Sequence, residues 1–243
     1  MLVRVIAFCG LAFVLTIVLG GGQQAAGLSQ ETVILAQWGP GLAALAMLLL
    51  FRSDSHRITV FDRTVRASRY VLAALIPMGG ALLVFAINRL TTCAPGLGGS
   101  MPIPWALLLW FPLGALGEEL GWRGYLHKRL NAGVAGLASS LIVGPLWALW
   151  HVGMYQNGVL YLAFFVLLMV SYTVVIYALV ADVGFNVLVA SLFHLMINVT
   201  NLLFYSVIND ARFILVSSLV WAGIALAMVL TRKTLFTAGR VTP

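Results

Sequence analysis

Long apolar segments separated by short polar connections run through the whole chain. A helix needs about 20 apolar residues to cross a hydrocarbon core of about 30 Å. We interpret eight segments as membrane-spanning helices: 2–20, 32–51, 70–90, 103–126, 134–153, 158–180, 184–206 and 213–230. The pattern therefore predicts an all-α polytopic membrane protein with about eight transmembrane helices, forming a single domain over residues 1–243.

The first two segments carry features that change this picture. Leu2 to Gly20 is followed by small residues, so a cleaved signal peptide is the alternative to a retained helix. We favour the retained helix because the apolar stretch is long enough to span. The second segment is interrupted by Gly39, Pro40 and Gly41, where we expect a kink.

Composition agrees with a membrane protein. Of the 243 residues, 62% are hydrophobic and 9% are charged, which excludes an ordinary soluble globular domain. The 24 glycines and 8 prolines are spread along apolar segments, as is typical of packed membrane helices rather than of a barrel of short alternating strands.

The net charge of +7 raises the question of a nucleic-acid partner. Basic residues gather in alternate connections, which are Arg52 to Arg69, Arg123 to Arg129, and Arg232 to Arg240. This is the positive-inside pattern, so the charge is explained by the lipid bilayer without nucleic acid. An even number of spans then predicts that both termini are cytoplasmic.

Within the first connection, Ile58, Phe61 and Val65 allow either a short helix on the membrane surface or a solvated loop.

The two cysteines, Cys9 and Cys93, are expected at different depths, so we predict neither a disulfide nor a metal pair.

Two adjacent carboxylates end the apolar part of the fourth segment. Ionised groups at membrane depth are costly and are usually functional. Glu119 and Arg123 are four residues apart, so on a helix they can form an ion pair. Glu118 is turned by about 100° from Glu119 and is left as a candidate general base. The alternative is that both acids simply begin the cytoplasmic interface.

Two of the four histidines lie in apolar surroundings. His151 follows Trp150, and His194 lies four residues before Asn198, so the latter two side chains point to the same side of a helix. A single buried imidazole commonly just bonds a backbone carbonyl. Together with Glu118, however, these residues form a candidate site, because their expected depths in the membrane agree within several ångströms. His56 and His127 lie in basic connections, and we expect them to be ordinary.

These residues resemble the three motifs of the CPBP intramembrane proteases, which include the type II CAAX prenyl endopeptidases. The motifs are Glu118-Glu119 with Arg123, an aromatic residue (Trp147) separated by three residues from His151, and His194 with Asn198. They lie within a core of residues 103–206. Trp147 stands where the family commonly has Phe, which we expect to matter little because both are aromatic packing residues.

The resemblance implies an intramembrane endopeptidase, and the wider motif strings look bacterial, so we expect a bacterial cytoplasmic membrane. Glu118 and His151 would activate a water, His194 and Asn198 would stabilise the oxyanion, and Glu119 with Arg123 would position Glu118. The substrate would be a membrane-associated peptide or protein. Glu118, His151 and His194 are also the ligand types of a catalytic zinc site. We favour the metal-free mechanism, and a zinc-dependent mechanism is the alternative.

Two other functions use the same residues. Buried acids, imidazoles and amides also make proton relays in transporters, but the paired broken helices of such folds are not evident here. A catalytically silent scaffold or bacteriocin-immunity factor is the third possibility, and its phenotype would survive loss of Glu118 and His194.

Overall fold

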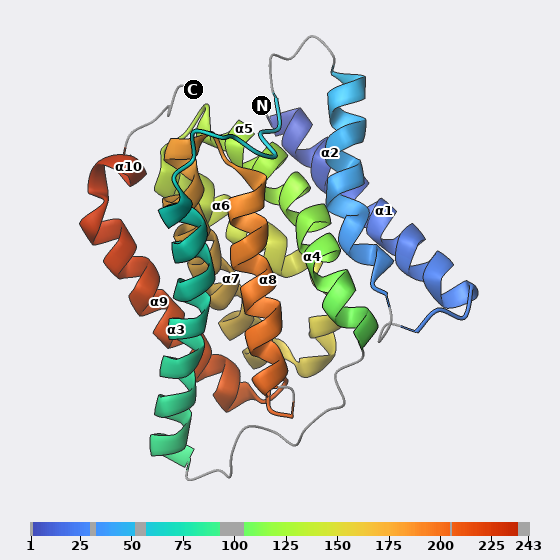
Figure 1. The fold of residues 1–243 in the computed structure, drawn as a ribbon. Coiled ribbons are helices and arrows are strands. Elements are labelled where there is room, and N and C mark those ends of the chain that lie inside the picture. Colours follow the sequence, from blue (N-terminus) through green and yellow to red (C-terminus); the bar gives the residue numbers. More distant parts are fainter. Residues whose placement is uncertain (1, 30–32, 52–56, 93–104, 205, 238–243) are drawn as a thin grey trace.

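The computed structural model describes residues 2–29, 33–51, 57–92, 105–204 and 206–237, and in these ranges the chain forms helices and no strands. Figure 1 shows the bundle. The long helices are α1 (Leu2–Ala25), α3 (Ala67–Thr92), α7 (Val159–Val180) and α9 (Ala211–Thr231). The helices α2 (Gly39–Leu50), α4 (Trp105–Glu119), α6 (Gly136–Trp150) and α8 (Val187–Asn201) are shorter. The short elements are η1 (Leu35–Trp38), η2 (Leu120–His127), α5 (Lys128–Asn131), η3 (Val152–Asn157), η4 (Ala181–Val183), η5 (Leu202–Phe204) and α10 (Lys233–Thr237).

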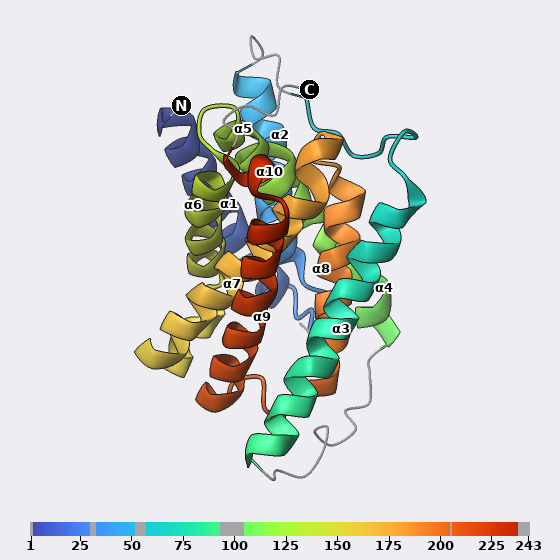
Figure 2. The same cartoon turned by 90° about the vertical axis from the view of Figure 1, so that its left-hand side faces the viewer.

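Each of the eight predicted segments corresponds to a helix, but the number that cross a membrane stays a prediction. Five helices in the described ranges are long and apolar enough to span: α1, α3, and three that begin at Val159, Val187 and Ala211. Leu35–Leu50 and Gly136–Trp150 are apolar but shorter. The basic residues before α3 and after α9 lie at the same end of the bundle, as the charge pattern predicts (Figure 2).

Six helices form a closed ring through their contacts. α4 packs on α8, α8 on α3, α3 on α9, α9 on α7, and α7 on α6, and α6 returns to η2 at the end of α4. The hairpin of α1 and α2 lies beside the ring and packs against α4 and η2 (Figure 1). Phe8 of α1 is fully buried against Trp122 and Tyr125, so α1 is part of the packed structure.

The second segment differs from its prediction. We expected a kink at Gly39, Pro40 and Gly41 within one helix, but this triplet begins α2, and the residues before it form the 3₁₀ turn η1. Pro40 lies in the first turn, where its missing N–H breaks no helical hydrogen bond. The helix therefore starts at the triplet instead of bending there.

Two further expectations are corrected. The described part of the first basic connection, residues 57–66, contains no helix, so the surface-helix alternative is wrong for these residues. Its Thr59 and Val60 carbonyls accept the N–H groups of Val187 and Leu188 at the start of α8. His127, expected to be an ordinary loop residue, is fully buried, and its Nε2 lies 3.1 Å from Oγ of Ser139.

The cysteine and remaining histidine predictions are tested only in part. Cys9 is a free thiol in α1. Cys93 and His56 lie outside the described residues.

Candidate active site

The two acids end α4, where the helix widens into the π-helical segment η2. Pi-helical turns carry extra residues and occur often at functional sites. Glu118 is 2% exposed and Glu119 is fully buried, so neither begins a solvated interface. Their side chains have different partners, as the angle of about 100° between neighbouring helical residues predicts.

Glu119 lies in a buried charge network behind the cavity. Its Oε1 accepts hydrogen bonds from Arg123 Nη1 at 2.7 Å, in the ion pair that their spacing predicts, and it lies 2.9 Å from His194 Nδ1 on α8. Arg123 also donates to the hydroxyl of Thr173 and lies 4.0 Å from the ring centre of Trp147. The Glu119 carboxylate therefore holds the His194 ring in place and does not contribute to the hydrogen bonds that hold Glu118.

Glu118 is held by one side chain on each of two other elements. Gln37 Nε2 of η1 donates to Oε1 at 3.0 Å, and Trp147 Nε1 of α6 donates to Oε2 at 3.0 Å. Both bonds are to a buried carboxylate, so they compensate part of the cost of removing it from water. Each oxygen retains further acceptor capacity for a water.

Glycines allow η1 and α2 to approach α4 closely enough for Gln37 to reach Glu118. A Cβ on Gly41 would lie 2.6 Å from the carbonyl oxygen of Gly117, and one on Gly121 would lie 2.4 Å from that of Pro40. At Gly114 a Cβ would lie 2.0 Å from Oε1 of Gln37 itself. Small residues of this kind let membrane helices pack backbone to backbone.

His151 lies just beyond α6, at its C-cap, rather than inside the predicted fifth helix. Its Nδ1 lies 2.8 Å from the carbonyl oxygen of Trp147, which can only accept, so Nδ1 carries the proton and Nε2 of the neutral ring is an acceptor. The ring packs edge-on against Trp150 and Phe165. Trp150 in turn donates to the hydroxyl of Thr16 on α1.

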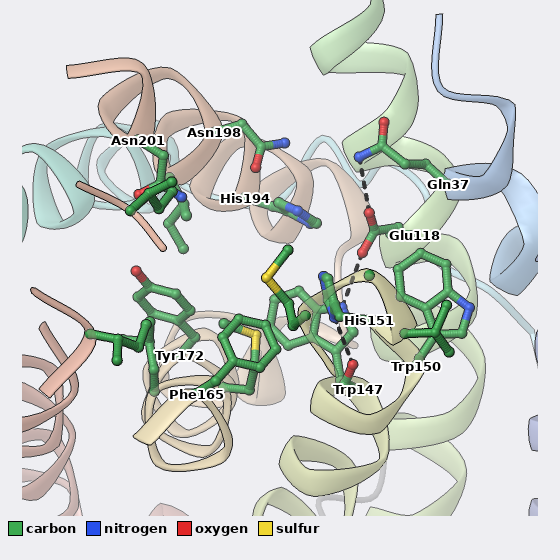
Figure 3. A pocket seen from close by; sticks show the side chains of 18 of the residues that line it. Gln37, Glu118, Trp147, Trp150, His151, Phe165, Tyr172, His194, Asn198 and Asn201 are labelled. Atoms are coloured by element: carbon green, nitrogen blue, oxygen red, sulfur yellow. Dashed lines mark hydrogen bonds between the residues drawn. The ribbon is translucent and has the colours of Figure 1, made fainter. Parts of the chain in front are cut away.

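A cavity of about 450 Å³ brings four of the predicted residues together: Glu118, His151, His194 and Asn198. Figure 3 shows that they come from three elements: Glu118 from α4, His151 from the end of α6, and His194 and Asn198 from α8. Asn198 lies one turn beyond His194, and Asn201 lies further along the same helix. Glu119 and Arg123 do not line the cavity and lie behind it. The remaining wall is mostly apolar and aromatic, with Phe165 and Tyr172 of α7 opposite the polar residues (Figure 3).

The zinc alternative does not fit this arrangement. Among the described residues, no group of three His, Cys, Asp or Glu side chains is placed to hold one metal ion. The hydrogen bonds of these side chains do not themselves prevent ligation, because the Glu118 oxygens retain acceptor capacity and the bonds of His151 and His194 use Nδ1 and not Nε2. We derive no step through a metal.

Sequence reasoning missed two residues of the site. Gln37 was not singled out, although it is a lone amide in an apolar stretch, which is a signal that could have drawn attention to it. Trp147 was expected to be interchangeable with Phe. Its indole N–H donates to Glu118, and a Phe could not make this bond.

Two comparisons with known proteins match the part of the chain that carries the motifs. The family described as "Type II CAAX prenyl endopeptidase Rce1-like" matches residues 100–200. "CAAX prenyl protease 2" of Methanococcus maripaludis is 33% identical over 76 residues, which cover 31% of this chain and 26% of that protein. The chain thus aligns with about a quarter of its relative. Motifs, family match and relative agree, and together they support the resemblance of residues 100–200 to the CPBP family of intramembrane proteases.

Proposed function

We propose that the protein is an intramembrane endopeptidase that hydrolyses a peptide bond with a water activated by Glu118 and His151. The observation that carries the proposal is the common cavity, which places a carboxylate, two imidazoles and an amide within the helix bundle. The family resemblance supports protease activity in general, and the residue roles rest on the contacts described above.

The water would be held between Glu118 and Nε2 of His151. Gln37 and Trp147 fix the carboxylate, and the Trp147 carbonyl fixes the imidazole tautomer, so both acceptors are preorganised. Glu118 takes a proton from the water as its oxygen attacks the carbonyl carbon of the substrate. The same proton then passes to the leaving amide nitrogen as the C–N bond breaks, which yields a carboxylate and an amine.

The oxyanion of the tetrahedral intermediate would be stabilised by N–H donors of His194 and Asn198. Because Nδ1 of His194 donates to Glu119, donation to the oxyanion falls to Nε2, and requires the protonated ring. The carboxylate of Glu119 favours that protonated form, and Arg123 holds Glu119 in place. Preorganised donors of this kind are worth about 10²- to 10³-fold each in kcat.

In this scheme Glu119 and Arg123 position His194. The resemblance implied that they position Glu118, and we assign that role to Gln37 and Trp147 instead, because these two side chains bond it directly.

The substrate would be a membrane-associated peptide or protein, presented with apolar side chains toward the wall around Phe165 and Tyr172. The words "CAAX prenyl" belong to the name of the relative, and the contacts described for this chain do not by themselves select such a peptide. We place the protein in a bacterial cytoplasmic membrane with both termini in the cytoplasm, from the charge pattern and the motifs.

Comparative proteomics of membranes tests the proposal. Cells that express the wild type are compared with cells that express Glu118→Ala, with Asp62→Asn, a half-buried acid outside the cavity, as the control. We expect cleaved peptides that appear with the wild type and Asp62→Asn and disappear with Glu118→Ala. Identical peptide sets in all three strains, or a liposome flux that depends on Glu118 without cleavage, would contradict the protease assignment.

Chelation tests whether cleavage proceeds without a metal ion. We expect cleavage by purified protein to survive dialysis against a chelator that removes all zinc, as measured by metal analysis of the same sample. Activity that is lost on dialysis and restored by stoichiometric zinc would contradict it.

A further inference from the structure

A second groove, of about 550 Å³, lies where α3 begins and where α7 and α9 end. None of the residues that line it also lines the candidate active site. Its polar part contains Arg66, Arg69, Asp182 and Arg232. The beginning of α3 and the end of α9 lie at the same end of the bundle in Figure 2.

Two of these arginines are held in place by one acid. Arg69 Nη2 and Arg232 Nη2 each lie 2.6 Å from Oδ2 of Asp182. Their Nη1 atoms donate to backbone carbonyls near the end of α7, both of them to that of Ala178. The guanidinium groups are therefore fixed side by side at the mouth of the groove.

The groove retains positive charge after this pairing. Three arginines face one carboxylate among the lining residues, and Arg66 is exposed. Asp62, outside the lining, accepts from Thr64 at the rim, so a positive excess remains even when it is counted. Each guanidinium has five N–H donors, and the bonds of Arg69 and Arg232 described here do not use all of them.

Below the arginines the groove is apolar. Leu72 and Ile76 of α3 and Met228 of α9 line it one to two turns further into the bundle. Leu72 is 45% exposed, and its neighbour Leu75 is 54% exposed, so this side of α3 faces lipid. A basic rim above an apolar wall at the ends of membrane helices matches the boundary between phospholipid headgroups and acyl chains.

We propose that this groove binds an anionic phospholipid, with its phosphate group at Arg66, Arg69 and Arg232 and one acyl chain along Leu72, Ile76 and Met228. Planar guanidinium groups suit phosphate oxygens because they donate two hydrogen bonds in parallel. The apolar wall distinguishes a phospholipid from a free phosphate ion, which would gain nothing from it.

The test uses the full-length protein in lipid nanodiscs made of dioleoylphosphatidylcholine with increasing dioleoylphosphatidylglycerol. Retained phosphatidylglycerol is measured by native mass spectrometry and its affinity by titration. The variant is Arg66→Gln, because Arg66 lies outside the cluster around Asp182 and its loss leaves that cluster intact. Arg63→Gln is the matched control, since Arg63 is an exposed arginine of the same loop that does not line the groove.

We expect Arg66→Gln to weaken phosphatidylglycerol binding about fivefold and Arg63→Gln to leave it unchanged, since one cation near anionic lipid contributes about 1 kcal/mol. Leu72→Gln is expected to weaken phosphatidylglycerol binding as well. Equal losses in Arg63→Gln and Arg66→Gln would overturn the proposal in favour of general surface charge. Inorganic phosphate that displaces the lipid at equal concentration would overturn it in favour of a free-anion site.

Discussion

Gln37 donates its side-chain amide to Oε1 of Glu118 at 3.0 Å, although 81 positions separate the two residues in the chain. Gln37 also lies outside residues 100–200, the range that matches the family. The candidate active site is therefore completed by a part of the chain that the three motifs do not include.

Replacement of Gln37 by alanine should lower kcat about tenfold and leave KM nearly unchanged. The bond orients the carboxylate and does not touch the substrate, and a hydrogen bond to a charged group is worth about 1.5–3 kcal/mol. Cleavage rates over a range of substrate concentrations measure the effect. Gln24→Ala, at an exposed position near the end of α1, is the control. A rise in KM with normal kcat would show that Gln37 binds substrate instead.

Gly114→Ala should reproduce the loss caused by Gln37→Ala. The new Cβ would lie 2.0 Å from Oε1 of Gln37, so the amide must move away from Glu118. Gly79→Ala in α3 is the matched control, because no atom lies within 4 Å of its Cβ position, and it should leave the rate unchanged. In the double variant of Gly114 and Gln37 the losses should not add, since both remove one interaction. Additive losses would mean that Gly114 acts elsewhere.

Trp147→Phe should lower the cleavage rate about tenfold while the protein stays folded. Phenylalanine keeps an aromatic ring beside Arg123 but removes the N–H that bonds Glu118. Trp110→Phe is the control, because Trp110 does not line the cavity and its indole N–H donates to the Ile34 backbone carbonyl rather than to Glu118. Unchanged activity in Trp147→Phe would support the interpretation from sequence that the two aromatic residues are equivalent here.

Arg123→Met should destabilise the protein by about 3–5 kcal/mol, because it leaves the buried carboxylate of Glu119 without its cation. Unfolding in detergent measures the loss. The pair of changes Glu119→Gln and Arg123→Met should cost less than Arg123→Met alone, since no charge is then left unpaired. Arg212→Met, at an exposed position, should change stability by no more than about 0.5 kcal/mol. Equal effects of the single and double variants would contradict the ion-pair explanation.

Patterns of short range in the sequence predicted local features well. Hydropathy located the helical segments, and spacing of four residues predicted the ion pair of Glu119 and Arg123. The same spacing placed His194 and Asn198 on the cavity side of α8. Each of these features depends on the geometry of one helix, which the sequence specifies locally.

Features that depend on contacts between distant segments were not predicted. The position of Gln37 follows from the close packing of α2 against α4, and the end of α6 before His151 places that ring outside the helix. The burial of His127 depends on serines of α6 and on aromatic rings of α7 and the turn after it. No periodicity within one segment reports such contacts.

The π-helical segment Leu120–His127 joins α4 to α5 without a break in the helix. Upstream, Glu118 faces the cavity, and at its downstream end His127 faces Ser139 and Ser140. Deletion of a single residue between them would rotate one part against the other by about 100° and shift it by about 1.5 Å. Either the acid or the imidazole would then lose its partners, so the structure constrains the length of this segment as well as the identity of its buried side chains.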